Sequence, residues 1–217
     1  MNKTNIEWAD YTWNPITGCT KISEGCANCY AHAVNRRFGK EKDFKVTVHE
    51  DRLREPTRLK KGAKIFVCSM SDLFHDDVPD AIIQYLIGVF IDCPQHIFQI
   101  LTKRPARMRS FMERYGGSLG SNVWHGVTAE NQERWDERVF DGCFVSVEPM
   151  LGPVHLHGKK PMWVICGPET GPEARAFDPE WARSLRNECL DAIIPFFYKK
   201  NQPECLARYK MWPKEMR

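Results

Sequence analysis

The chain has 217 residues, of which 42% are hydrophobic and 27% are charged, and its formal net charge is +3. These values are typical of a globular protein with a sizeable core, and they exclude a disordered chain or a fibre. No apolar run reaches the roughly 18–20 residues that cross a bilayer, and the first residues lack the pattern of a signal peptide. We therefore expect a cytoplasmic protein without a membrane partner, in a reducing environment where cysteines stay thiols or bind metal.

Strands and helices alternate along most of the chain. The patterns predict helices over 27–38, 79–91, 105–115, 131–140 and 179–192, and strands over 64–69, 96–101, 123–127, 143–147, 162–166 and 194–198. Such alternation implies a parallel sheet with helices packed outside it. The units are too few for a full eight-unit barrel. We predict an α/β fold, a partial barrel of the (β/α)6 type with parallel strands and outer helices, as a single domain over 1–217.

Three of the nine cysteines lie close together in the loop over 13–32, as Cys19-(x6)-Cys26-(x2)-Cys29. The odd number and the expected compartment disfavour disulfides and favour a metal site. Three thiolates suit an iron–sulfur cluster and leave its fourth iron open to another ligand. A structural zinc site with His32 as the fourth ligand is the alternative. We favour the iron–sulfur interpretation.

Polar residues follow five of the predicted strands, where parallel α/β proteins bind ligands. The segments that carry them are 69–72, 102–104, 128–131, 146–149 and 167–171, with Arg175 beyond the last. Each alone is also explained as a helix N-cap, above all at Asp72, Thr102 and Asn131. Five such segments at the same end of successive strands indicate one binding rim.

Two basic runs, over 52–64 and 103–114, favour either a solvated helix face or contacts with phosphates. Several tryptophans offer rings that stack on a nucleobase, although most are expected to be core residues. We regard Trp13 and Trp124 as the candidates for substrate contacts.

The cysteine segment 13–31 resembles the signature of a "three-Cys-motif" family of phages and bacteria. That family is regarded as radical-SAM-like and is distantly similar to spore photoproduct lyase. The resemblance extends through the segments 69–75, 102–105, 122–124, 127–131, 148–153 and 163–165. It therefore covers nearly the whole chain.

The resemblance implies a [4Fe–4S] cluster held by Cys19, Cys26 and Cys29, with S-adenosylmethionine on the open iron. One electron would cleave the sulfonium, and the resulting 5′-deoxyadenosyl radical would abstract hydrogen from a substrate. The cofactor-binding residues would be Ser69, Ser71, Asp72, Lys103, Glu130, Asn131, Glu148 and Glu169. Trp13, Arg104, Trp124, Arg175 and Lys199 would contact the substrate. Cys166 is a candidate hydrogen donor, although a buried filler is the simpler interpretation.

Two features depart from the usual radical-SAM pattern. The first gap between cysteines is six residues, and Asn28 stands where an aromatic residue is common, so Tyr30 is a candidate contact for adenine.

The reaction implied by the resemblance is the modification of a nucleic acid or nucleotide, with electrons from a flavodoxin- or ferredoxin-type reductant. The alternative function is a non-catalytic zinc- or iron–sulfur-binding module that partners another protein.

Overall fold

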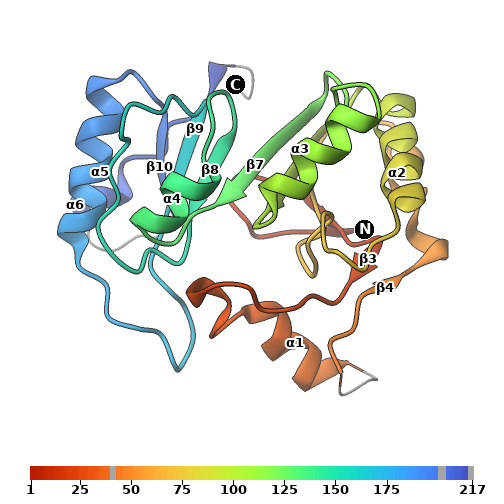
Figure 1. Ribbon diagram of the computed structural model, residues 1–217, viewed down its shortest axis with the longest axis horizontal. Coiled ribbons are helices and arrows are strands. Elements are labelled where there is room, and N and C mark those ends of the chain that lie inside the picture. Colours follow the sequence, from red (N-terminus) through yellow and green to blue (C-terminus); the bar gives the residue numbers. More distant parts are fainter. Residues whose placement is uncertain (40–42, 200–203, 215–217) are drawn as a thin grey trace. The chain divides into compact units, whose positions relative to one another are not determined.

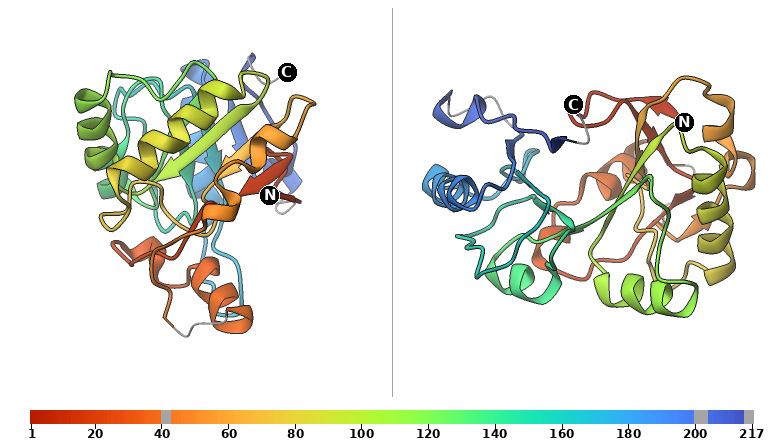
Figure 2. Two further views of the ribbon diagram at one scale, coloured as in Figure 1. Left: turned by 90° about the vertical axis from the view of Figure 1, so that its right-hand side faces the viewer. Right: turned by 90° about the horizontal axis from the view of Figure 1, so that it is seen from above.

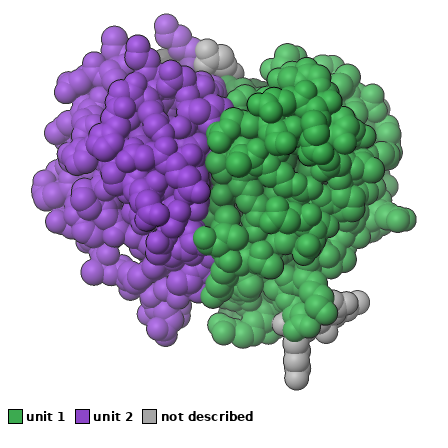
Figure 3. Space-filling model, in the orientation of Figure 1, with its two compact units in different colours: residues 1–22, 29–125 green, residues 23–28, 126–217 purple. Residues whose placement is uncertain are grey.

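The computed structural model describes residues 1–39, 43–199 and 204–214. The chain forms two compact units, coloured separately in Figure 3: residues 1–22 and 29–125 make the first, and residues 23–28 and 126–217 make the second. The cysteine motif is shared between them, because Cys19 and Cys29 belong to the first unit and Cys26 to the second. The single domain over 1–217 stays a prediction.

The first unit contains a mostly parallel sheet with helices outside it (Figures 1 and 2). Its strands, in spatial order, are β1 (Asn2–Lys3), β2 (Tyr11–Trp13), β5 (Lys64–Val67), β6 (Ile97–Thr102) and the start of β7 (Val123–Thr128). β2, β5 and β6 are parallel, and β1 is antiparallel to β2. The helices are α1 (Tyr30–Phe38), α2 (Asp80–Asp92) and α3 (Pro105–Arg114). A small antiparallel pair, β3 (Ile16–Thr17) and β4 (Thr47–Val48), and two 3-10 turns (Glu50–Arg52 and Glu55–Arg58) complete it.

The second unit continues the same alternation. The end of β7 is followed in spatial order by β8 (Phe144–Val147), β9 (Trp163–Cys166) and β10 (Phe196–Tyr198), all parallel. Its helices are α4 (Gln132–Arg138), α5 (Pro179–Asp191) and α6 (Glu204–Ala207), and a 3-10 turn over Glu24–Cys26 carries one of the three cysteines. Asp178 begins α5 by accepting a hydrogen bond from the amide of Glu180 at 2.9 Å.

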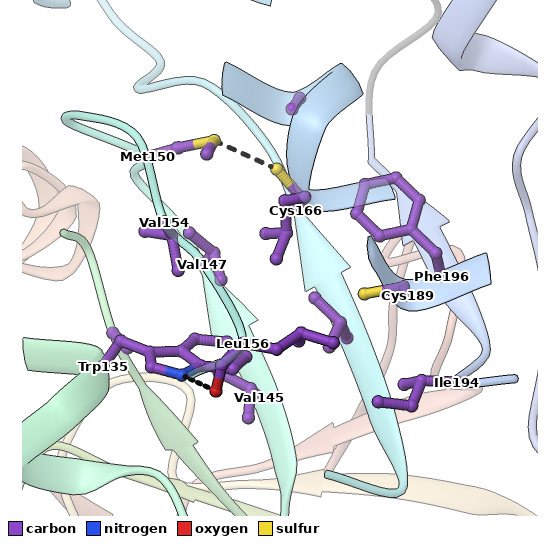
Figure 4. Packing of buried hydrophobic residues seen from close by; sticks show 14 of the residues in the cluster. Trp135, Val145, Val147, Met150, Val154, Leu156, Cys166, Cys189, Ile194 and Phe196 are labelled. Atoms are coloured by element: carbon purple, nitrogen blue, oxygen red, sulfur yellow. Dashed lines mark hydrogen bonds between the residues drawn. The ribbon is translucent and has the colours of Figure 1, made fainter. Parts of the chain in front are cut away.

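Each unit has its own apolar core. In the first, the fully buried ring of Trp13 packs against Phe90 and Phe98 at centroid distances of 6.1 and 6.0 Å. In the second, buried side chains from β8, β9 and α5 meet Trp135 of α4, whose indole donates to the carbonyl of Leu156 at 3.1 Å (Figure 4). These cores make the strand ends rigid platforms for the loops that follow them.

The structure confirms the predicted α/β fold with parallel strands and outer helices. Every predicted helix and strand is present, with ends displaced by up to three residues. Strand β2 was not predicted, because a strand of three residues with one buried side chain leaves no apolar run to recognise. Among the described residues, no helix has both the length and the apolar character required to cross a membrane.

Candidate functional site

Gly18 directly follows β3 and precedes the first cysteine of the loop. This residue has φ +92°, and a Cβ here would lie 1.8 Å from the carbonyl oxygen of Lys45, so only glycine fits. The Gly18 amide donates to the carbonyl of Met70 at 3.0 Å, and the Ser71 hydroxyl donates to the Gly18 carbonyl at 2.6 Å. These bonds fix Cys19, the next residue, beside the segment that follows β5.

A buried guanidinium faces the sulfur of Cys19. Arg104, which follows β6, is 8% exposed, and its Nη1 lies 3.8 Å from Cys19 Sγ and 3.2 Å from Asp72 Oδ2. Its Nη2 donates to the hydroxyl of Thr20 at 3.0 Å. Burial lowers the pKa of Arg104, but the interactions with Asp72 and Cys19 outweigh burial and raise this pKa above its ordinary value. The guanidinium therefore keeps its charge beside the cysteine.

Asp72 connects the carboxyl ends of β5 and β6. Its buried carboxylate accepts hydrogen bonds from the Thr102 hydroxyl at 2.7 Å, the Phe74 amide at 2.9 Å and the Lys103 amide at 3.0 Å. Arg104 supplies a fourth donor. The structure thus brings Asp72, Lys103 and Arg104 together, as the idea of a binding rim requires, and their roles toward a ligand stay predictions.

Ser69 contacts two segments from earlier in the chain, at Asn14 and at the first residue of α1. The side chains of Asn14 and Ser69 are hydrogen-bonded at 3.0 Å, and Asn14 Oδ1 also accepts from the Met70 amide at 2.9 Å. Cys29 is the residue that precedes α1, and the next residue, Tyr30, donates its hydroxyl to the Ser69 carbonyl. Through these contacts Ser69 and Cys29 are held near one another within the first unit.

In the second unit, a buried carboxylate holds the part of the loop that carries Cys26. The Gly25 amide donates to Glu130 Oε1 at 3.3 Å, and Arg138 Nη1 lies 3.1 Å from Glu130 Oε2. Glu130 is fully buried and Arg138 is 2% exposed, and Arg138 also donates to the Thr128 carbonyl at 3.0 Å. A Cβ at Gly25 would lie 2.9 Å from the Glu130 carboxyl carbon, so this contact requires glycine. Glu130 therefore acts on the cysteine loop directly.

A second carboxylate, Glu169, holds the other side of the same loop segment. Its Oε2 accepts from Arg175 Nε at 2.8 Å and from Asn28 Nδ2 at 3.2 Å. Asn28 also donates to the Glu173 carbonyl at 2.7 Å, and Arg175 Nη2 donates to the Glu24 carbonyl at 3.0 Å. Hydrogen bonds from Arg175, assisted by Asn28, lower the pKa of Glu169 to about 2. Glu169 and Arg175 are therefore paired with one another and with the loop.

We expect acid to weaken the second unit through Glu169. The folded pKa of about 2 lies below the ordinary value of 4.5, so ionised Glu169 contributes fully above about pH 5, and this contribution is lost as the pH falls toward 2. Glu169→Gln removes the negative charge that pairs with Arg175, so it should lower the free energy of unfolding in urea at pH 7. The expected loss is only about 1–2 kcal/mol, because solvent screens part of this interaction. The deficit should shrink at pH 3. Glu173→Gln, a change at an exposed side chain, should give no such pH-dependent difference.

The remaining rim residues of the second unit differ in their surroundings. Lys199 Nζ lies 2.7 and 2.9 Å from the two carboxylate oxygens of Glu148, so a residue predicted to contact the substrate is paired with one predicted to bind the cofactor. Asn131 caps α4, where its side chain accepts from the Arg134 amide at 3.0 Å. This is the helix-capping interpretation, and a second role of Asn131 toward a cofactor stays a prediction.

Two further candidates, Cys166 and Trp13, have surroundings typical of core residues, and a third, Trp124, is partly exposed. Cys166 is fully buried, its sulfur lies 3.5 Å from Met150 Sδ (Figure 4), and burial raises its thiol pKa well above the ordinary value. The fully buried Trp13 donates its indole N–H to the Arg52 carbonyl at 2.8 Å. Trp124 is half-buried on β7. A hydrogen-donor role for Cys166 and stacking by the tryptophans stay predictions.

The three thiols fit an iron–sulfur cluster by the chemistry of their donors. The cysteines among the described residues are thiols rather than disulfides, and Cys19 and Cys29 are partly exposed. Among the described residues, however, no group of three or more His, Cys, Asp or Glu side chains is arranged to hold a metal ion. His32, the fourth ligand of the zinc alternative, is half-buried with its ring 4.5 Å from that of Phe44. The three thiol ligands are therefore present in the chain. The spacing of the cysteines in the sequence, rather than their arrangement in the structure, identifies them as ligands.

The residues that position this loop were not predicted from the sequence. They are Asn14, Thr20, Gly25, His75 and Arg138. His75 is buried with its Nε2 2.7 Å from the Thr20 hydroxyl oxygen, and burial, with help from Arg104, lowers its pKa. The first four lie inside segments already singled out, but only the folded chain shows their partners. Arg138 reads as an ordinary charged residue of a helix, and its burial has no signal in the sequence.

Comparisons with known proteins found one family model and one solved structure that match the chain. A family model described as "Protein of unknown function (DUF5131)" matches residues 3–209. No curated protein matches the sequence. Among solved structures, a mutant of spore photoproduct lyase matches with a TM-score of 0.57 at 10% sequence identity, covering 92% of this chain and 78% of that one. At this identity the match shows the fold, and it confirms the predicted structural similarity to that lyase.

Proposed function

The chain belongs to the DUF5131 family, and we propose that it is a radical S-adenosylmethionine enzyme with a [4Fe–4S] cluster held by Cys19, Cys26 and Cys29. The structural match supports a radical-SAM-like function, because spore photoproduct lyase is a radical SAM enzyme. Membership of the three-Cys-motif family of phages and bacteria stays a prediction.

One observation carries the proposal. The chain has the fold of a radical SAM lyase, and three thiols lie in the segment between β2, one of its parallel strands, and α1, after the short strand β3. Ligand sites of parallel α/β folds lie at the carboxyl ends of strands. Three thiolates satisfy three irons of a four-iron cluster. When bound, the cluster and S-adenosylmethionine would supply the electron and the radical that this chemistry uses.

The chain's own residues would orient these groups. In the first unit, the bonds of Gly18 to Met70 and Ser71 hold Cys19 at the strand ends. The hydroxyls of Ser69 and Ser71 already take part in hydrogen bonds within the chain, but each keeps acceptor capacity for an ammonium group. We propose that these two serines bind the methionyl end of S-adenosylmethionine, and that Asp72 supports them by holding Thr102, Lys103 and Arg104 at the strand ends.

Further contacts with the cofactor would come from the remaining rim residues. Lys103 is half-buried next to Asp72 and would pair with the methionyl carboxylate. In the second unit, the Glu148 carboxylate would accept hydrogen bonds from ribose hydroxyls, since Lys199 neutralises it and leaves lone pairs available. Glu130 and Glu169 would act by holding the loop around Cys26.

The surface of α1 supports a nucleic acid or nucleotide as the substrate. Tyr30, Val34 and Phe38 are 53%, 40% and 72% exposed, at helical spacing on one face. Arg36 and Arg37 are exposed on the same helix, and Arg37 lies 5.0 Å from the Phe38 ring centroid. Aromatic rings with neighbouring cations are the elements with which proteins bind single-stranded nucleic acid. The helix starts directly after Cys29, so a strand bound there would lie next to the cysteine loop.

Replacing both arginines tests this surface. Arg36→Ala/Arg37→Ala should weaken binding of a fluorescent single-stranded DNA 20-mer and lower the slope of log K against log salt by about 1–2, because each lost phosphate contact contributes about 0.7. The matched control, Arg183→Ala/Arg186→Ala, removes two arginines from α5 and should leave the slope unchanged. Equal slopes for wild type and the α1 variant would remove the argument for a nucleic acid on this helix.

Anaerobic reconstitution tests the cluster itself. Incubation with ferrous iron, sulfide and reductant should give a brown protein with about four irons and four sulfides per chain. The alternative, a non-catalytic zinc module, predicts one tightly held zinc per chain and no colour, in which case the proposed function is wrong. Electrons would come from a flavodoxin- or ferredoxin-type protein, which dithionite can replace in the assay.

A further inference from the structure

The four N–H groups on Nη1 and Nη2 of Arg104 all face partners within the chain. A guanidinium has five N–H groups. The two on Nη1 face Asp72 Oδ2 at 3.2 Å and Cys19 Sγ at 3.8 Å, and the two on Nη2 face the Thr20 hydroxyl and carbonyl at 3.0 and 3.4 Å. Nε lies 3.7 Å from Asp76 Oδ2. Since the side chain is also 7% exposed, a phosphate or carboxylate of a substrate cannot reach Nη1 or Nη2 without breaking these contacts.

The same contacts place the positive charge of Arg104 next to the sulfur of Cys19. Asp72, itself buried, balances the guanidinium, and Asp76 on the outer side is 78% exposed, so solvent screens its charge. Cys19 is thus in direct contact with a desolvated cation. Hydrogen bonds to cluster sulfurs and the local net charge are what set the reduction potential of an iron–sulfur protein. A cationic donor stabilises the reduced cluster, which carries the more negative charge.

We propose that Arg104 is a positioning and tuning residue of the cluster, which donates a hydrogen bond to the sulfur of Cys19 and raises the reduction potential, with Asp72 as its counter-charge. This inference rests on the proposed function, because it requires a cluster bound through Cys19. It replaces the predicted role of Arg104 as a contact for substrate. Asp72 holds Arg104 in place, and its negative charge lowers the reduction potential that Arg104 raises.

The test is a redox titration of reconstituted protein, without S-adenosylmethionine, followed by the electron paramagnetic resonance of the reduced cluster. Arg104→Gln should lower the reduced-to-oxidised ratio at a fixed potential about tenfold, a 59 mV shift for one electron. Asp72→Asn should shift the ratio in the opposite direction, because the guanidinium loses its counter-charge. The matched control is Arg107→Gln, since Arg107 pairs with Asp80 at 3.0 Å and donates to the Val78 carbonyl at 2.6 Å rather than to a cysteine. It should leave the potential unchanged.

A merely structural role makes a different prediction. It allows both Arg104→Gln and Asp72→Asn to destabilise the fold, but it does not move the potential in opposite directions. If Arg104→Gln does not assemble a cluster, Arg104→Lys is the variant to measure, since it keeps the positive charge and loses the planar guanidinium. Its reduction potential should lie below that of the wild type, by less than the 59 mV expected for Arg104→Gln. Unchanged potentials in variants that bind iron would overturn the inference alone. Failure of the wild type to bind a cluster would overturn the proposed function and the inference with it.

Discussion

Replacing any one of Cys19, Cys26 and Cys29 with alanine is expected to reduce the iron bound after reconstitution by roughly tenfold or more, because loss of a direct ligand costs more than the 10–100-fold typical of a supporting residue. The fold should persist, since Cys19 and Cys29 are only partly buried and each change removes a single sulfur from a loop. Iron and sulfide analysis, with circular dichroism for the fold, measures both expectations.

Two buried cysteines provide the matched controls. Cys93 and Cys143 are 1% and 0% exposed, and burial raises the pKa of both thiols, that of Cys143 to about 11. Such thiols are poor ligands and behave as small apolar side chains. Cys93→Ala and Cys143→Ala should bind as much iron as wild type. Iron retained by the three loop variants, or lost equally from the controls, would show that the loop is not the cluster site.

The second large effect is expected at Glu130. Glu130→Gln should destabilise the protein by about 3–5 kcal/mol, because it leaves the buried Arg138 charge with only the exposed carboxylate of Glu137 at 3.7 Å. It should also speed hydrogen exchange at the Gly25 amide, which loses a charged acceptor. Urea unfolding and amide exchange measure these two changes. Gly25→Ala should disturb the same contact from the other side, since the new Cβ would lie 2.9 Å from the carboxyl carbon of Glu130.

Glu133, on the helix α4 that also carries Arg138, offers the comparison. It pairs with Arg134 at 3.2 Å, but its side chain is 69% exposed. Exposed pairs contribute at most about 1 kcal/mol, so Glu133→Gln should change stability little and leave exchange at Gly25 unaltered. If the two glutamates behaved alike, Glu130 would not be the anchor of the loop.

Much of the fold followed from the sequence, for a physical reason. The strands β5, β6, β8 and β9 bury nearly every side chain, so they appear as apolar runs. The helices beside them are marked by proline or glycine: Pro79 precedes α2, Pro105 and Pro179 begin α3 and α5, and Gly116 follows α3. The strand β2 escaped recognition because its three residues carry no such run, although the cysteine loop depends on it.

The candidate site was only partly predictable. The cysteine spacing and the polar strand ends are local patterns, so Cys19, Asp72 and Arg104 could be identified from the amino-acid sequence alone. What each does depends on partners far along the chain: Arg104 lies 85 residues from Cys19, and Gly25 lies 105 from Glu130. Such pairings are set by topology. For that reason Arg104 and Arg175 read as contacts for substrate, whereas the structure gives them partners within the chain.

Reductive cleavage of S-adenosylmethionine is the most direct measurement of the central claim. Reconstituted protein with dithionite should release 5′-deoxyadenosine and methionine, and the Cys19→Ala, Cys26→Ala and Cys29→Ala variants should release none, because these thiols would hold the cluster that supplies the electron. A wild-type protein that carries a full cluster, or tightly bound zinc, and leaves S-adenosylmethionine intact under these conditions would contradict the account.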